Sequence, residues 1–212
     1  MSTSTKNLWD LTSAVAVIVG IVGFLAGAVV ALAGHRLSLR SVEFPLGHVQ
    51  DIAVDHQGNI ILALGFYGRI QLYDANGRFR RSWSADALGG EFTVSFRQPD
   101  LVASYAGRRG STVFYTLAGE PVREERDEAS GSPDDKPLSI AGPGGTRLSV
   151  HRPLFWPMVV RETDRGVATL IAEPWYLRPV EGPLPTWLLA CAGGLLSRRT
   201  LGRIGGWWRR AV

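Results

Sequence analysis

The sequence has few of the residues that build disulfides and metal centres. Among its 212 residues Cys191 is the one cysteine, which excludes an intramolecular disulfide and a cysteine-based metal cluster. The four histidines show neither H-x-x-x-H nor HExxH spacing, so a helical zinc site is not expected. We therefore predict no metal ion and no cofactor.

The sequence also lacks the motifs of the common enzyme classes. It contains no G-x-S-x-G nucleophile elbow, no phosphate-binding loop and no G-x-G-x-x-G dinucleotide turn. The glycine-rich stretch 142–145 has no Lys followed by Ser or Thr after it, so we interpret it as a turn. The sequence thus predicts no catalytic residue and favours a protein that is not an enzyme.

Charge is unevenly distributed along the chain. Residues 41–173 hold 14 Lys and Arg against 17 Asp and Glu, whereas the two flanking segments hold 9 against 2. A folded region with an acidic balance does not offer the basic face that nucleic acid requires, so we predict no nucleic-acid partner. The basic flanks instead suit anionic lipid headgroups.

Residues 14–33 form a run of twenty without a charged or strongly polar side chain. As a helix this run would be about 30 Å long, the thickness of the hydrocarbon core of a bilayer. We predict a polar segment over 1–13 and a transmembrane helix over 14–34, in which Gly23 and Gly27 form a GxxxG helix-packing motif. A cleaved signal peptide is the alternative, but its apolar region is usually only ~7–15 residues long.

A second apolar segment, 183–197, is predicted to be a short membrane helix, followed by a basic and aromatic interfacial tail over 198–212. If 183–197 spans the bilayer, both chain ends share the cytoplasmic side and the region between lies outside the cytoplasm. If it lies in the interface, the single span places that region in the cytoplasm. We favour two spans and an extracytoplasmic domain.

Aromatic and basic residues beside the two apolar segments are expected at the lipid headgroups. These residues are Trp9, Arg36, Arg40, Trp175, Tyr176, Trp187, Arg198, Arg199, Trp207 and Trp208.

Residues 41–175 have the alternation of short β-strands joined by tight turns. Asn76-Gly77 is the strongest hairpin signal, because Asn-Gly accepts positive φ. A shift of 42 residues places 60–63 over 102–105 and 69–74 over 111–116, and a fainter third copy follows. We predict a mainly β domain of three propeller-blade-like four-stranded meanders, over about 48–84, 91–126 and 137–173, with an exposed acidic loop over 127–137.

The first copy, DIAVDHQGNI over 51–60 and RIQLYDANGRF over 69–79, resembles an NHL-type β-propeller repeat, and 93–121 resembles it more weakly. The resemblance implies blade-like sheets and a surface that binds a ligand or a partner. Propellers usually have about 4–8 blades, and this chain has room for three. Three arrangements therefore stay open: an open stack of three sheets, a ring completed by several chains, or a sandwich.

Asp51, Asp55 and His56 are the best candidates for metal-dependent chemistry, because lactonase-like propellers bind a metal at the mouth of the ring. We prefer to interpret Asp55 and His56 as turn residues, since Asp side chains cap backbone amides in turns.

We expect a membrane-anchored, non-enzymatic β-repeat protein that binds a partner protein or a second copy of itself beside the bilayer. A metal-dependent lactonase-like hydrolase and a ligand-sensing ectodomain are the alternatives.

Overall fold

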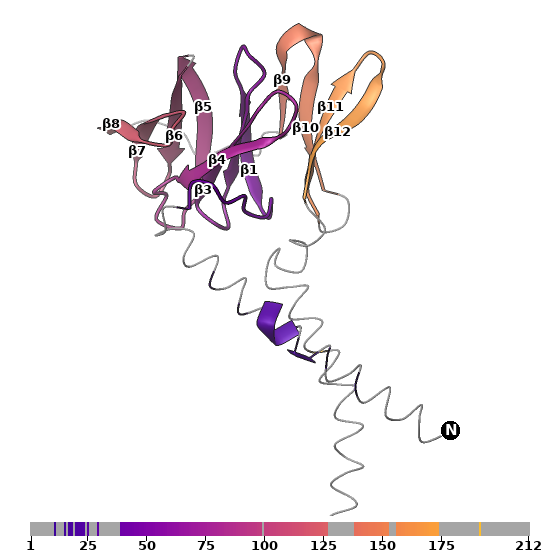
Figure 1. Ribbon diagram of the computed structural model, residues 1–212. Helices are drawn as coiled ribbons and strands as arrows, with labels where there is room; N and C mark the ends of the chain where they lie inside the picture. The colour runs from indigo at the N-terminus through magenta and orange to yellow at the C-terminus, as the bar shows by residue number, and fades with distance from the viewer. Residues whose placement is uncertain are drawn as a thin grey trace, which may run out of the picture. The chain divides into compact units, whose positions relative to one another are not determined.

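The computed structural model describes four stretches of the β-domain and scattered residues outside it (Figure 1). The stretches are 39–98, 100–126, 138–152 and 156–173, and the scattered residues are Leu11, Val15, Val17, Ile18, Gly20–Gly23, Leu25, Val29 and Cys191. The chain divides into two compact units, one made of Met1–Val29 with Pro179–Val212 and the other of Val30–Arg178.

In the first unit the described residues are helical, and their large apolar side chains are mostly exposed. The described residues contain no helix long and apolar enough to cross a membrane. Much of the predicted span 14–34, including Gly27, lies outside the described residues, whereas Gly23 is helical and half-buried.

Several other predictions also fall outside the described residues. They concern the acidic loop 127–137, the segment 183–197 apart from Cys191, the tail 198–212, and the interfacial residues Trp9, Arg36, Trp175, Tyr176, Trp187, Arg198, Arg199, Trp207 and Trp208.

The β-domain consists of three four-stranded antiparallel sheets, each a meander in chain order, which confirms the predicted mainly β fold. The first sheet contains β1 (Val49–Val54), β2 (Ile60–Leu64), β3 (Arg69–Tyr73) and β4 (Phe79–Ser84). The second contains β5 (Phe92–Gln98), β6 (Leu101–Ala106), β7 (Ser111–Thr116) and β8 (Pro121–Arg126). The third contains β9 (Ser139–Ala141), β10 (Arg147–His151), β11 (Met158–Thr163) and β12 (Gly166–Ala172), with a 3₁₀ turn, η1 (Pro143–Gly145), after β9.

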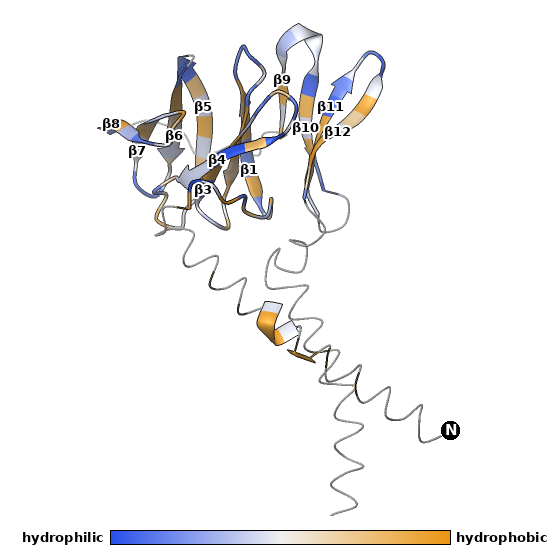
Figure 2. Ribbon diagram, in the orientation of Figure 1, coloured by the Kyte–Doolittle hydropathy of each residue, from blue (hydrophilic) through white to orange (hydrophobic). Residues whose placement is uncertain are grey.

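The first sheet lies in the middle of the domain, between the other two. One of its faces packs on the second sheet, through Ile61, Ile70 and Trp83 against Phe92, Val94 and Val113 among others. Its other face packs on the third sheet, through residues such as Ile60, Leu62 and Tyr73 against Leu148, Val159 and Ile171. Every residue of β2 and β3 is buried as a result. Figure 2 shows orange, hydrophobic segments within strands such as β1 and β5, and blue, hydrophilic residues in most turns.

The described chain is therefore an open stack in the spatial order third, first, second. The first strands of the sheets come together, because β1 contacts both β5 and β9. This is the relation that inner strands have in a propeller, where sheets radiate from a common axis.

The Asn76-Gly77 turn joins β3 to β4 as the sequence predicts. Gly77 has a φ of +75°, and its N–H donates to the carbonyl of Asp74 at 2.9 Å. The Asp74 carboxylate accepts hydrogen bonds from the backbone N–H groups of Asn76 at 2.9 Å and Arg78 at 3.0 Å.

Acid is expected to weaken this hairpin through Asp74. The hydrogen bond from Arg78, together with that from Asn76, holds the pKa of Asp74 below its ordinary value of 3.8. The folded state thus favours the ionised carboxylate, so its stabilisation is present above the unfolded-state pKa and is lost as the pH falls through the lowered pKa. Urea unfolding at a series of pH values should show that Asp74→Asn removes part of the acid sensitivity. An unchanged pH dependence would contradict this assignment.

Candidate functional site

Asp51, Asp55 and His56, the candidate metal ligands, lie in turns or form contacts within the β-domain. Asp55 caps its turn, because its carboxylate accepts the backbone N–H groups of Gln57 and Asn59, both at 2.8 Å, and the Asn59 amide at 2.7 Å. The predicted turn role of Asp55 is confirmed, and His56 is an exposed turn residue. Asp51 joins two sheets: its Oδ2 accepts the backbone N–H of Val94 at 2.8 Å. In the described part of the chain no three His, Cys, Asp or Glu side chains are grouped to hold a metal ion.

A cluster of buried polar side chains binds the segment that leads into the β-domain. We call residues 39–46 the entry segment. Arg69 is fully buried and donates to Ser82 Oγ at 2.8 Å and to the carbonyl of Leu39 at 3.0 Å, with its guanidinium 4.4 Å from the centre of the Phe44 ring. Burial lowers the pKa of Arg69 to about 10, so the side chain stays charged near neutral pH.

The cluster continues along β3. Gln71 donates from Nε2 to the carbonyl of Phe44 at 2.9 Å and accepts a hydrogen bond from the Tyr73 hydroxyl, which also lies 3.1 Å from Glu43 Oε1. Burial raises the pKa of Glu43 and, with the nearby carboxylates of Glu43 and Glu173, the pKa of Tyr73. The path of the chain into the domain is therefore fixed by buried polar contacts.

Both chain connections lie at one end of the sheets, which we call the entry end. Leu39 contacts Arg69, where β3 begins, and Glu173 directly follows β12, whose last residue, Ala172, pairs with the first residue of β11. The first and third sheets are joined at this end, because Arg152 donates to the carbonyl of Val49 at 2.7 Å. The entry end also carries the loops 65–68, 85–91 and 107–110.

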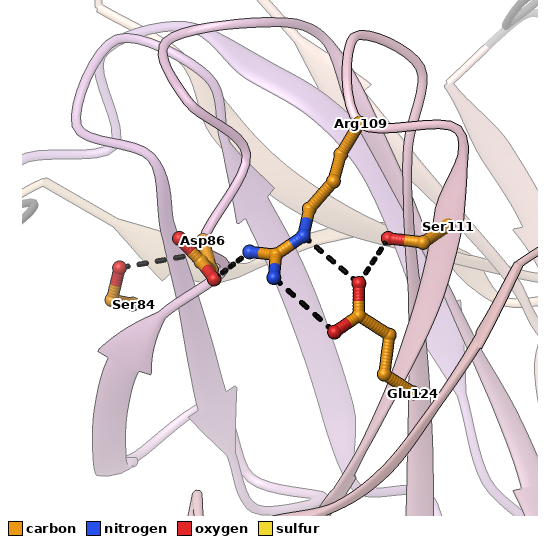
Figure 3. A network of polar contacts seen from close by, with 5 residues as sticks. All are labelled: Ser84, Asp86, Arg109, Ser111 and Glu124. Atoms are coloured by element: carbon orange, nitrogen blue, oxygen red, sulfur yellow. Dashed lines mark hydrogen bonds and ion pairs between the residues drawn. The ribbon is translucent and has the colours of Figure 1, made fainter.

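A network of charged and polar groups braces two of these loops (Figure 3). Arg109 forms an ion pair with Asp86 and donates to both carboxylate oxygens of Glu124, at 2.9 and 3.2 Å. The Ser111 hydroxyl donates to the same carboxylate at 2.7 Å, and together with Arg109 it holds the pKa of Glu124 below its usual range. Asp86 has a φ of +51°, a left-handed backbone that this network holds in place.

The outer face of the third sheet carries a Ser–His–Glu cluster that the sequence reading missed. Ser149 donates to Glu162 Oε1 at 2.7 Å, and His151 Nε2 lies 3.1 Å from Ser149 Oγ and 3.7 Å from the same Glu162 oxygen. In a catalytic triad the serine hydroxyl donates to one histidine nitrogen and the acid binds the other. Here Ser149 and Glu162 both lie beside the same histidine nitrogen, Nε2, and the Ser149 hydroxyl donates to Glu162. The arrangement therefore does not activate Ser149 as a nucleophile.

The 42-residue shift relates the outer face of the second sheet to a face of the first sheet that is already packed. Ala53, Ile61 and Leu72, which pack on the second sheet, correspond to Ser95, Ala103 and Phe114. The pairings Ser95 with Ala103 and Ala103 with Phe114 place these three on one face of the second sheet, opposite Val94 and Val113. No strand in the described stretches packs on that outer face.

The third sheet has the complementary outer face. Leu148, Val150 and Val159 face the first sheet, so Ser139, Ser149 and Val160, which alternate or pair with them, point outward. No strand of the described stretches packs on either outer face, although Ala103 and Phe114 of the second sheet and Ser149 and Val160 of the third are buried.

Of the predicted membrane-interface residues, Arg40 is the one within the described stretches. Its carbonyl accepts the N–H of Ser82 at 2.9 Å, and its side chain forms an exposed ion pair with Glu120 at 3.4 Å. Arg40 thus contacts both the first and the second sheet.

No protein-family model matches this chain, and no curated protein does. A solved structure of streptogramin B lyase is similar over 60% of this chain and 42% of its own length, with 13% sequence identity and a TM-score of 0.34. This chain thus corresponds to less than half of that structure, and a TM-score of this size supports no conclusion about fold or function. The three sheets fit a propeller-like fold, and the NHL repeat in particular stays a prediction.

Proposed function

We propose that the protein is a membrane-anchored, non-enzymatic β-repeat protein whose domain associates with a second copy beside the bilayer. The observation that carries the proposal is the pair of outer faces at the two ends of the stack, on which no strand of the described stretches packs. Each corresponds to a face of the first sheet that is already packed, so a second chain can repeat the packing that exists within one chain.

The anchor is supported by residues on both sides of the domain. The run 14–33 is long enough to span a bilayer, and the helical residues described within it expose Ile18, Val22 and Leu25 among others. Both chain connections leave the domain at its entry end, which is the arrangement expected if both flanking segments are in the membrane. We place the domain on the extracytoplasmic side, from the basic residues of the predicted tail.

Two copies supply six sheets, within the range of about 4–8 blades that propellers use. The second sheet of each copy would pack on the third sheet of the other, giving a two-fold symmetric ring with two identical interfaces. The two outer faces mix apolar and polar side chains, including Phe114, Arg123, Val160 and Glu162, and this composition is typical of interfaces between chains that are also stable apart.

A charged side chain on either outer face is expected to prevent this association. Ser95→Arg places a cation on the outer face of the second sheet, and Thr169→Arg places one on that of the third, where Thr169 pairs with Val160. Each variant should shift the full chain from dimer to monomer in native mass measurements from detergent or nanodiscs, because an unpaired buried charge is costly. Val42→Arg, at an exposed position of the entry segment, is the control and should stay dimeric.

A wild-type chain that is monomeric at all accessible concentrations would contradict self-association and leave a different protein as the partner. A dimer that both arginine variants retain, with unchanged circular dichroism, would place the interface elsewhere.

A further inference from the structure

We infer that the entry end of the β-domain is itself a membrane-binding surface. Leu88 and Phe66 would enter the headgroup layer of an anionic bilayer, and Arg108 would contact lipid phosphates. The inference rests on the proposed membrane anchor, and it assigns a partner, the bilayer surface, to a set of loops that has no other role in the proposed function.

The loops of the entry end form one continuous surface. The N–H of Gly65 donates to the carbonyl of His48 at 2.9 Å, and the N–H of Ala85 donates to the carbonyl of Gly68 at 2.9 Å. The N–H of Gly107 donates to the carbonyl of Glu91 at 3.2 Å. Backbone hydrogen bonds therefore connect all three loops at one end of the sheets.

The tips carry the residue types that bind a bilayer surface. Leu88 is 64% exposed and has a φ of +50°, an unfavourable backbone conformation that leaves an apolar side chain in solvent. Phe66, in the sequence Gly65–Gly68, is 39% exposed and packs edge-on against the buried Tyr67. Arg108, at the tip of the third loop, is exposed and forms no ion pair with any residue in the described stretches.

The opposite end of the sheets has a different character. Five of its turns contain a carboxylate: Asp55, Asp74, Asp100, Glu120 and Asp164. Two of them are paired with bases, Asp74 with Arg80 and Glu120 with Arg40, as Asp86 is paired with Arg109 at the entry end. Asp55, Asp100 and Asp164 form no ion pair with a residue of the described stretches, against Glu91 alone in the three loops of the entry end, and an anionic bilayer repels such unpaired carboxylates.

The length of the chain also brings the entry end to the bilayer. The predicted span ends at residue 34 and the described entry segment begins at Leu39. Five residues extend at most about 18 Å, so Leu39 cannot lie farther than this from the end of the span. The carbonyl of Leu39 accepts a hydrogen bond from Arg69 at the entry end, so a span that ends at residue 34 would leave this end within reach of the headgroups.

Site-specific fluorescence tests the inference on the full chain in nanodiscs that contain phosphatidylserine. In a Cys191→Ser background, an environment-sensitive dye is attached at Leu88→Cys, at Phe66→Cys and, as the matched control, at Val167→Cys. Val167 is 67% exposed and is the second residue of β12, at the opposite end of the third sheet. Doxyl-labelled lipids should quench the dyes at 66 and 88 several-fold more than the dye at 167. With the dye at 66, Arg108→Gln should lower the ratio of docked to undocked domain about fivefold.

Equal lipid quenching at 88 and 167 would overturn the inference, as would a dye at 88 that is shielded from water but not quenched by lipid, since a protein would then cover the loop. A chain that does not co-purify with the discs would instead contradict the proposed anchor. The failure of the anchor and the failure of the docking surface are thus separate results.

Discussion

Arg69→Ala is expected to destabilise the β-domain by about 3–5 kcal/mol. The substitution leaves a cavity beside Phe44 and removes the donors that reach the buried Ser82 and the half-buried carbonyl of Leu39. Buried acceptors that lose a donor cost about 1–3 kcal/mol each. Urea unfolding of the full chain in nanodiscs, followed by circular dichroism of the strands, measures the loss.

Arg123 provides a matched control. Its guanidinium also lies over a phenylalanine ring, 4.3 Å from the centre of Phe114, but its side chain is 57% exposed and paired with Glu125. Arg123→Ala should therefore change stability by no more than about 1 kcal/mol. If the two variants lose similar stability, the buried cluster is not what fastens the entry segment.

Gly77→Ala is expected to cost about 3 kcal/mol or more and to loosen the third sheet from the first. Gly77 has a φ of +75°, where an alanine alone costs about 1–2 kcal/mol. An added Cβ would also overlap the carbonyl oxygen of Leu170 and lie 2.9 Å from its carbonyl carbon. Because Leu170 belongs to β12, the clash separates two sheets that bury Tyr73 and Ile171 between them.

Gly110→Ala separates the backbone cost from the clash. Gly110 has a φ of +62°, but no atom lies within 4 Å of the position of an added Cβ. Only the left-handed penalty of about 1–2 kcal/mol should remain there. Hydrogen exchange should be faster in β10, β11 and β12 of the Gly77 variant alone; equal exchange in the two variants would contradict the packing of the third sheet on the first.

The strands and turns of this protein were predictable from sequence because their signals are local. The alternation around β1 to β4, the Asn76-Gly77 turn and the cap by Asp55 each depend on residues a few positions apart. The repeat at 42 residues likewise predicted the second sheet, since it copies a pattern already present in the first.

The order of the sheets and the buried cluster were not predictable in this way. Arg69 occupies a position in the alternating strand pattern that predicts an exposed side chain. It is buried because Leu39 and Phe44 contact it, and these two residues belong to a segment that has no strand pattern. Asp51 was a candidate ligand because it lies close in sequence to Asp55 and His56. Its hydrogen-bond partner Val94 is 43 residues away, so no local pattern could predict that contact. The cluster of Ser149, His151 and Glu162 forms only when β10 and β11 pair, and no spacing motif in the sequence predicts it.

Cross-linking between two differently marked copies tests the proposed assembly most directly. One copy carries Ser95→Cys on the outer face of β5, the other carries Ser139→Cys on the outer face of β9, and Cys191 is replaced by Ser in both. A short bismaleimide should join the two copies to each other much faster than either copy to itself, because the second sheet of one chain faces the third sheet of the other. Cross-links only between identical copies, or none from chains that fold normally, would contradict the ring.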